Sequence, residues 1–225
     1  IHEETITGVR TLWVEGPPPY RAMLGFRVGF ADESLRRHGL THLVEHLALS
    51  RVGSVPHFYN GGVSLSQSHL MAGGTTEQVT AFLETACAAL ADLPLERLET
   101  EIGVLQAEDA PRRASAHAHI LADLFGLAGA GVTALPEYAL AWVGDAEVTD
   151  WARSWFTAGN AVLALTGPPP AGLRLPLPPG PGRPPVMPPV RPDIPNRRSL
   201  GIGGVQEEVT RLVRKVMAHA AGRAS

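Results

Sequence analysis

The sequence predicts an α+β fold, in which antiparallel strands are combined with helices. Two stretches near its start have strand patterns. Residues 5–14 are rich in β-branched and aromatic types, and between residues 22 and 30 every second residue is apolar. A short loop with three consecutive prolines joins the two stretches, so we expect these strands to pair antiparallel. At residues 79–90, by contrast, apolar residues recur at helical spacing.

Five helices are expected before the proline-rich segment, and several have start or stop signals. Thr75 and Gln78 are spaced as a capping box, and Thr149 is the expected cap of the fifth helix. Pro111 should end the helix that follows Pro94. The expected helices cover residues 34–50, the stretch from the capping box to about residue 90, the stretch between residues 94 and 111, residues 115–127 and residues 148–156.

The remaining segments are expected to be strands, loops and a connector. Residues 51–62 have a loop pattern, and residues 63–72 and 160–167 have strand patterns, the latter buried. Between residues 168 and 195 lie 13 of the 20 prolines, which predicts an extended connector. An apolar stripe then predicts a short amphipathic helix. We therefore expect a folded domain at 1–167, a proline-rich connector at 168–198 and a C-terminal amphipathic helix at 199–225.

Composition excludes several classes of function. The 225 residues carry a net charge of −3, and no lysine or arginine cluster is interleaved with aromatics, so nucleic acid is not an expected partner. The single cysteine, Cys87, lies in a helical apolar pattern and allows no disulfide within the chain, which indicates a reducing, cytoplasmic location. Neither a signal-peptide pattern nor an apolar run near 18 residues is found, so no membrane partner is expected.

The stretch at residues 39–47, Gly-Leu-Thr-His-Leu-Val-Glu-His-Leu, has a pattern suited to metal binding. On a helix, His42 and His46 lie one turn apart on one face with Glu45 beside them, and four apolar residues lie on the opposite arc. Two neutral imidazoles at this spacing fit a tetrahedral zinc ion (Zn²⁺), and the adjacent carboxylate can take a proton from a water molecule. The alternative is that these are only partly buried polar residues of a helix.

The order H-x-x-E-H is the inverzincin motif, and it resembles the M16 (pitrilysin-type) zinc metallopeptidases. The family pattern continues with a helix reading E-x6-E, which this chain has from Glu101 to Glu108. Seven residues are close to two helical turns, so both carboxylates share one face. The resemblance implies that Glu108 is the third metal ligand and that Glu101 contacts a ligand residue without binding the metal itself. An exposed acidic helix is the alternative interpretation.

The resemblance extends over residues 5–167. Asn60, Gly61 and Gly62 stand where the family has N-A-x-T, the start of an edge strand that pairs with the substrate backbone, although Asn-Gly-Gly is also an ordinary turn. Pro136, Gly144 and the stretch 160–167 continue the family pattern in order. The resemblance implies an antiparallel sheet with helices packed mainly on one face.

Other histidines have simpler interpretations. His38 is four residues before His42, but Gly39 lies between them, so we expect a surface residue or one that supports the site from behind. His69 is expected on a strand, facing solvent or the sheet. His117 and His119 lie two apart, which places them on different faces of a helix and excludes a joint metal site.

The function implied by the resemblance is zinc-dependent hydrolysis of short or unfolded peptides, with Glu45 as the base. M16 enzymes close two homologous domains around the peptide, and this chain has room for one, so a second M16-like subunit is an expected partner. A heteromer is favoured over a homodimer, which would lack the residues that the family takes from its second domain. The alternatives are a non-catalytic M16-fold subunit and a small-molecule zinc hydrolase. Two departures from the family are the separation of 62 positions from His46 to Glu108, which is shorter than usual, and Thr41 before the first histidine.

Overall fold

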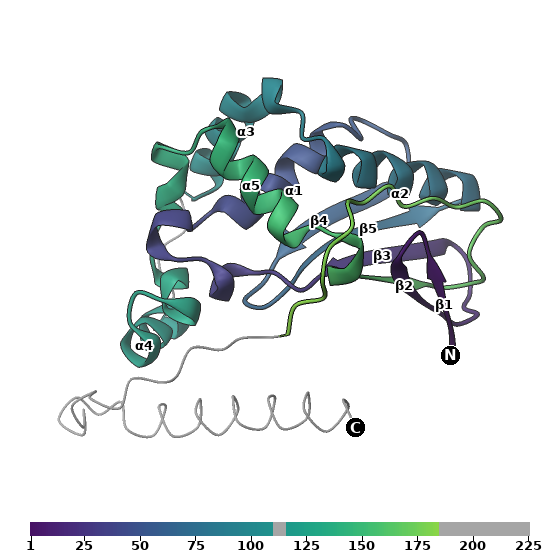
Figure 1. Ribbon diagram of the computed structural model, residues 1–225, viewed down its shortest axis with the longest axis horizontal. Helices are drawn as coiled ribbons and strands as arrows, with labels where there is room; N and C mark the ends of the chain where they lie inside the picture. The colour runs from purple at the N-terminus through teal and green to yellow at the C-terminus, as the bar shows by residue number, and fades with distance from the viewer. Residues whose placement is uncertain (110–115, 185–225) are drawn as a thin grey trace.

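The computed structural model describes residues 1–109 and 116–184, which form a six-stranded sheet packed with helices (Figure 1). The strands are β1 (His2–Ile6), β2 (Val9–Trp13), β3 (Tyr20–Phe26), β4 (Phe58–Val63), β5 (Ser68–Gly74) and β6 (Ala161–Leu165). The α-helices are α1 (Leu40–Ser50), α2 (Thr76–Ala91), α3 (Leu98–Asp109), α4 (Ala116–Phe125) and α5 (Asp145–Trp155). The predicted α+β class is confirmed.

The strand order is β1-β2-β6-β3-β5-β4, and one pair, β2 with β6, is parallel. The expected direct pairing of the first two strand stretches is wrong, because β6 lies between β2 and β3. Residues 5–14 also do not form one strand. Thr7 and Gly8 adopt positive φ angles of 47° and 85°, which suit a tight hairpin turn, and this turn divides the stretch into β1 and β2. The sheet is therefore mixed, with antiparallel pairs predominating.

One face of the sheet is covered by helices and holds the core. In β3, Ala22, Leu24 and Phe26 are buried, whereas Met23 on the opposite face is exposed. Helix α2 packs on β3 and β5, and α1 packs on β4 and β5 and also contacts α2, α3 and α5. The Cys87 side chain of α2 is buried in this core. Helix α1, with its histidines, therefore lies against both the sheet and its neighbouring helices.

Several boundaries differ from the sequence-based expectation. Helix α1 begins at Leu40 rather than at residue 34, because Gly39 has a φ of 107°, which a continuous helix does not permit. Two short 3-10 turns, η1 (Phe30–Asp32) and η2 (Leu35–Arg37), precede it. Strand β4 begins at Phe58, inside the expected loop, and a turn at 64–67 separates it from β5.

The expected caps have different outcomes. The capping box of α2 is confirmed, since Thr75 and Gln78 each bond the backbone of the other. Thr149 does not cap α5 but lies within it. The helix begins four residues earlier, where the Glu147 carboxylate accepts a hydrogen bond from the Gly144 backbone N–H. Helix α4 matches its predicted range to within two residues.

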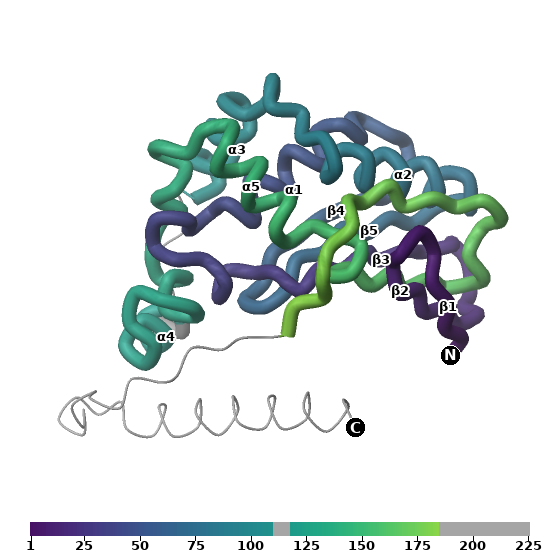
Figure 2. The backbone as a smooth tube through the Cα atoms, viewed as in Figure 1, coloured from purple at the N-terminus to yellow at the C-terminus, as the bar shows by residue number. Residues whose placement is uncertain are grey.

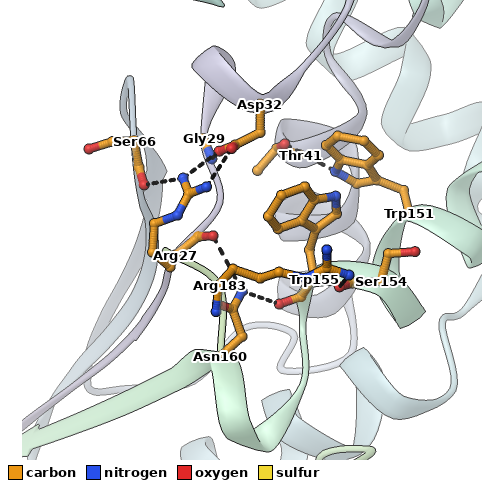
Figure 3. Close-up of polar contacts among 10 residues, drawn as sticks. All are labelled: Arg27, Gly29, Asp32, Thr41, Ser66, Trp151, Ser154, Trp155, Asn160 and Arg183. Carbon is orange, nitrogen blue, oxygen red and sulfur yellow. Dashed lines mark hydrogen bonds and ion pairs between the residues drawn. The ribbon is translucent and has the colours of Figure 1, made fainter. Parts of the chain in front are cut away.

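The first half of the proline-rich connector lies against the domain. Figure 2 shows this yellow-green segment returning past α2 after β6. Three leucines that alternate with other residues point into the core, namely Leu173, Leu175 and Leu177. The Arg183 guanidinium then lies 4.9 Å from the centre of the Trp155 ring, which Arg27 also contacts at 5.5 Å (Figure 3). Hydrogen bonds from Arg183 to Asn160 and Ser154 secure this contact.

The predicted C-terminal helix, the second half of the connector and Pro111 lie outside the described residues. Within the residues that the structure describes, no helix is long and apolar enough to cross a membrane.

Candidate metal centre

Helix α1 presents His42, Glu45 and His46 because its other face is anchored in the core. Leu43, Val44 and Leu47 are completely buried. The first turn of this helix has no side-chain cap of its own. The buried Glu33 carboxylate replaces one, since its two oxygens accept hydrogen bonds from the backbone N–H groups of Gly39 and Thr41 at 2.9 and 2.8 Å. A negative charge at a helix N-terminus is favourable.

His42, His46 and Glu108 form the one group among the described residues whose ligand atoms could hold a metal ion. These atoms all lie within 4.8 Å of one another. The two imidazole rings are nearly perpendicular, with centres 4.8 Å apart, and His46 Nε2 lies 4.0 Å from Glu108 Oε1. Donor atoms that share one zinc ion lie about 3–4 Å apart. The two nitrogens and one oxygen therefore fit a zinc ion after a small adjustment.

Helix α3 brings the two carboxylates of the E-x6-E pattern to the same side. Glu108 is 45% exposed and lies at the mouth of the site. Glu101 is buried, with its Oε2 3.5 Å from His46 Nδ1, and its Oε1 accepts a hydrogen bond from Arg97 at 2.9 Å. Glu101 thus contacts the side of the His46 ring that faces away from the candidate ligand atoms.

Glu45 lies between the two histidines. Its Oε2 is 3.8 Å from His46 Nε2 and 4.0 Å from His42 Nε2. Burial raises the pKa of Glu45 to about 7; the charge of His42 opposes this change, and the charges of Glu108 and Glu101 add to it. An ion bound by the histidines would add positive charge and lower this pKa again. That lowering favours the deprotonated carboxylate, which is the form that can accept a proton as a general base.

The pKa of His46 is lowered, because burial and the charge of His42 outweigh the opposing effects of Glu108 and Glu101. A lowered pKa favours the neutral imidazole, which is the form that binds a metal.

Strand β4 forms the opposite wall of a pocket of about 710 Å³. Asn60, Gly61 and Gly62 line it together with the three candidate ligands and Glu45. A side chain on Gly61 would collide with Glu45, whereas one on Gly62 would meet the His69 ring at 3.0 Å. Among the described residues β4 is the last strand of the sheet, so its outer edge pairs with no other strand there. The predicted role of this segment in substrate binding remains a prediction.

Two buried residues at the site have no signal in the sequence motifs. Glu137, at the start of the 3-10 turn η5 (Tyr138–Ala141), lies with its Oε1 2.9 Å from His42 Nδ1, although 95 positions separate the two residues. Glu33 caps α1, as described above. A single sequence could not identify either one, because neither stands at a fixed spacing from the motif.

The other histidines do not join the metal group. His38 is buried rather than at the surface, and it pairs with Glu33 at 2.9 Å and with the Leu135 carbonyl oxygen at 3.2 Å. His69 lies on β5 and is half-buried beside Gly62. His119 lies on α4 and is outside the metal group found among the described residues.

Comparisons with known proteins rest on structure alone. No family model matches the chain, and no curated protein matches its sequence. Pitrilysin superposes with a TM-score of 0.65 at 15% identity, over 84% of this chain and 24% of pitrilysin. The ferredoxin protease FusC, solved with Arabidopsis ferredoxin, gives 0.66 at 18% identity, over 85% of this chain and 26% of that one. A protease from Helicobacter pylori gives a TM-score of 0.61 at 13% identity, over 73% of this chain and 45% of that protease.

A chain of Complex III2 from Candida albicans is also similar, with a TM-score of 0.59 at 14% identity, over 86% of this chain and 48% of that one. Identities this low show the fold alone. The protein is therefore an α+β domain with a candidate His-His-Glu metal centre. Its fold is the M16, or pitrilysin-type, fold. The chain spans about a quarter to a half of the length of these similar proteins.

Proposed function

We propose that this chain is the metal-binding, catalytic-type domain of an M16-like zinc endopeptidase. The observation that carries the proposal is the convergence of His42, His46 and Glu108, with ligand atoms within 4.8 Å, around the buried carboxylate of Glu45. Three protein ligands that leave one position open are typical of catalytic rather than structural zinc sites. The pocket next to them is bordered by an edge strand, which suits a peptide substrate.

Each residue has a specific role in the proposed reaction. Zinc in such a site supplies Lewis acidity and lowers the pKa of water at the open position. Glu45 takes the proton from the attacking water and passes it to the leaving amine. The position of Glu45 near both Nε2 atoms, at 3.8 and 4.0 Å, supports this role. Glu101 contacts the far side of the His46 ring and helps to fix its orientation.

The proposed substrate is a short or unfolded peptide. An extended peptide can add to the outer edge of β4 at Asn60–Gly62 and so pass the candidate metal site. A folded protein cannot readily offer an extended segment to this edge. The small-molecule hydrolase is the weaker alternative, since the edge strand beside the pocket has no evident use for a small substrate.

Metal content and single substitutions test the proposal. Protein purified without any chelator should contain about one zinc ion per chain, and His42→Ala or Glu108→Ala should remove this ion. Glu45→Gln should retain fold and zinc but lose about 10²–10⁴-fold in peptide hydrolysis, because the amide cannot accept a proton. Elemental analysis that finds no zinc in the unmutated protein would refute the metal assignment. Hydrolysis by Glu45→Gln at the unmutated rate would refute the assignment of the base.

A second candidate function is a non-catalytic M16-fold subunit. The observation that favours it is the similarity to a chain of Complex III2. Against it, the two histidines, the base and the third ligand are all present and lie together. A zinc-loaded chain that hydrolyses no member of a peptide library, even with a partner domain, would favour this candidate.

The proposed enzyme works with a second M16-like subunit. This chain covers 24–26% of pitrilysin and FusC and 45–48% of the other two similar chains. The open pocket beside β4 leaves a bound peptide exposed on one side, and positioning supplies a large share of catalytic rate. The partner is proposed to be a different subunit, with a homodimer as the alternative. Full activity of the isolated chain, at concentrations where light scattering finds only monomer, would contradict this proposal.

A further inference from the structure

We propose that Glu137 is the positioning carboxylate for His42, and that the absence of a side chain at Gly39 leaves room for Glu137. The inference rests on the proposed function in one respect, namely that His42 is a metal ligand. No motif in the sequence assigns a role to either residue. The arrangement of side chains around the two histidine rings carries the argument.

The two histidines have matching surroundings. His42 Nδ1 lies 2.9 Å from Glu137 Oε1, and His46 Nδ1 lies 3.5 Å from Glu101 Oε2. Both Nε2 atoms lie near Glu45, on the side of the pocket. Each ring therefore has a carboxylate at Nδ1 and faces the candidate metal position through Nε2. The contact to Glu137 is the shorter of the two, and the Glu137 side chain is only 4% exposed.

A carboxylate at Nδ1 has a defined chemical effect on a neutral imidazole. The ring donates its Nδ1–H to the carboxylate, so the lone pair remains on Nε2, where a metal would bind. Such partners also fix the plane of the ring and increase its basicity as a ligand. The proton of His42 would otherwise be free to occupy Nε2 and block the metal.

Gly39 provides the space through which Glu137 reaches the ring. A Cβ on Gly39 would lie 2.8 Å from Glu137 Cβ and 3.4 Å from Glu137 Oε2. The first distance is shorter than real Cβ contacts, so one of the two residues would have to move. Gly39 also has the φ of 107° that starts α1. Gly39 thus marks the start of α1 and also leaves space for the Glu137 carboxylate, which contacts His42 in the first turn of the helix.

The segment that carries Glu137 is fixed to the same end of α1. The Ala139 N–H donates to the His38 carbonyl oxygen at 3.0 Å, and His38 Nε2 lies 3.2 Å from the Leu135 carbonyl oxygen. His38 Nδ1 in turn pairs with Glu33, which caps the helix. The hydrogen bonds that hold the segment of Glu137 therefore come from the start of α1, whereas Glu101 and Glu108 lie on α3. Each histidine has a support on a different element.

The orientation of the His42 ring in the metal-free protein is the first test. At a pH of about 8 or above, where unperturbed imidazoles are neutral, ¹⁵N–¹H correlation spectra should show His42 with its proton on Nδ1. The signal is assigned by its absence from the spectrum of His42→Asn. Glu137→Gln should retain this tautomer, because an amide oxygen still accepts the Nδ1–H, whereas Glu137→Ala should lose it. A wild-type proton on Nε2, or an unchanged tautomer in Glu137→Ala, would overturn the proposal.

Zinc affinity, measured by competition with a chromophoric chelator, is the second test. Glu137→Ala should weaken binding about 10–100-fold, as expected for loss of an outer partner of a ligand, and Glu137→Gln should weaken it less. Gly39→Ala should also weaken binding, because the added Cβ displaces Glu137 and because a φ of 107° disfavours alanine. Glu99→Gln, which removes a carboxylate from the exposed face of α3, is the control and should bind zinc normally. An affinity for zinc in Glu137→Ala equal to that of Glu99→Gln would overturn the proposal.

The two tests separate this inference from the proposed function. If the unmutated protein binds no zinc, the proposed function fails, while the tautomer of His42 still tests the role of Glu137. If zinc binds and hydrolysis proceeds but the Glu137 variants change neither tautomer nor affinity, only the present inference fails. Circular dichroism of each variant verifies that α1 remains folded. If Glu137→Ala does not fold, the zinc affinity of Glu137→Gln is compared with that of Glu99→Gln, and equal affinities would overturn the proposal.

Discussion

Replacing Gly61 with alanine tests how closely the edge strand and the catalytic base are fitted together. A Cβ on Gly61 would overlap Glu45 Oε1, and it would lie 2.7 Å from Glu45 Cδ and 2.9 Å from Leu49 Cδ1. Distances below 3.0 Å are essentially never found for real Cβ atoms, so a neighbour must move. Glu45 is buried and its carboxylate is the nearest group. We expect the carboxylate to be displaced from its place between the two histidines.

The size of the effect follows from the size of that displacement. Ordinary contact begins at 3.4 Å, so the nearest carboxylate oxygen has to retreat by roughly 1.5 Å, and a misplacement of even about 1 Å can cost about 10²-fold in rate. Complete loss of a general base costs about 10²–10⁴-fold. Gly61→Ala should therefore lower kcat/KM by about 10²–10³-fold. Zinc affinity should change little, because the closest atoms to the new methyl group belong to Glu45 and Leu49 and not to a candidate ligand.

The assay compares peptide hydrolysis, zinc content and thermal unfolding of Gly61→Ala with those of Gly73→Ala. The control adds a methyl group on the neighbouring strand β5, away from the pocket residues, where its nearest contact is Arg21 Cγ at an ordinary 3.6 Å. Both variants should be assayed in whichever preparation hydrolyses peptides, the chain alone or the chain with its partner. Unmutated activity in a zinc-loaded Gly61→Ala protein would refute the argument. Loss of zinc from Gly61→Ala would also refute it, since the effect would then lie on the ligands.

Two further predictions concern buried titratable groups. Burial lowers the pKa of His38, but the hydrogen bond and charge of Glu33 and the charge of Glu137 outweigh it, so the pKa is raised above its ordinary value of 6.5. The protonated pair therefore adds stability that is fully present below about pH 6.5 and is lost as the pH rises through the folded pKa. Urea unfolding should show a larger difference between the unmutated protein and His38→Gln at about pH 6 than at about pH 9, and an equal difference would contradict the pairing. Burial raises the pKa of Cys87 to about 12, so iodoacetamide should modify this thiol only when the protein unfolds, as mass spectrometry of native and denatured samples can verify.

How much of the fold could be predicted depends on how local each feature is. The capping box of α2 and its apolar stripe lie within one segment, so the sequence was sufficient to predict them. The insertion of β6 between β2 and β3 is a pairing over more than 130 residues, and no local pattern encodes it. The turn at Thr7 and Gly8 was local, but its positive φ angles are unusual for threonine, so the stretch was interpreted as one strand.

The same distinction applies to the candidate site. His42, Glu45 and His46 share one helical turn, and their common face follows from helix geometry alone. Glu108 comes from another helix, and only the resemblance to the M16 pattern connected it with the histidines before the structure placed it among them. The Gly61 contact could not be predicted, because it depends on how closely β4 approaches α1.

Glu137 shows where such reasoning reaches its limit. Two histidines one turn apart on a partly buried helix face each need an acceptor for Nδ1–H, because a buried donor without a partner is costly. The sequence therefore implies two partners, and helix periodicity offers one of them, Glu101, on the helix that also carries Glu108. The other partner lies on a 3-10 turn whose place is set by the bonds of His38 to Leu135 and Ala139. The number of partners thus follows from chemistry, whereas the identity of the second follows only from the tertiary contacts at the start of α1.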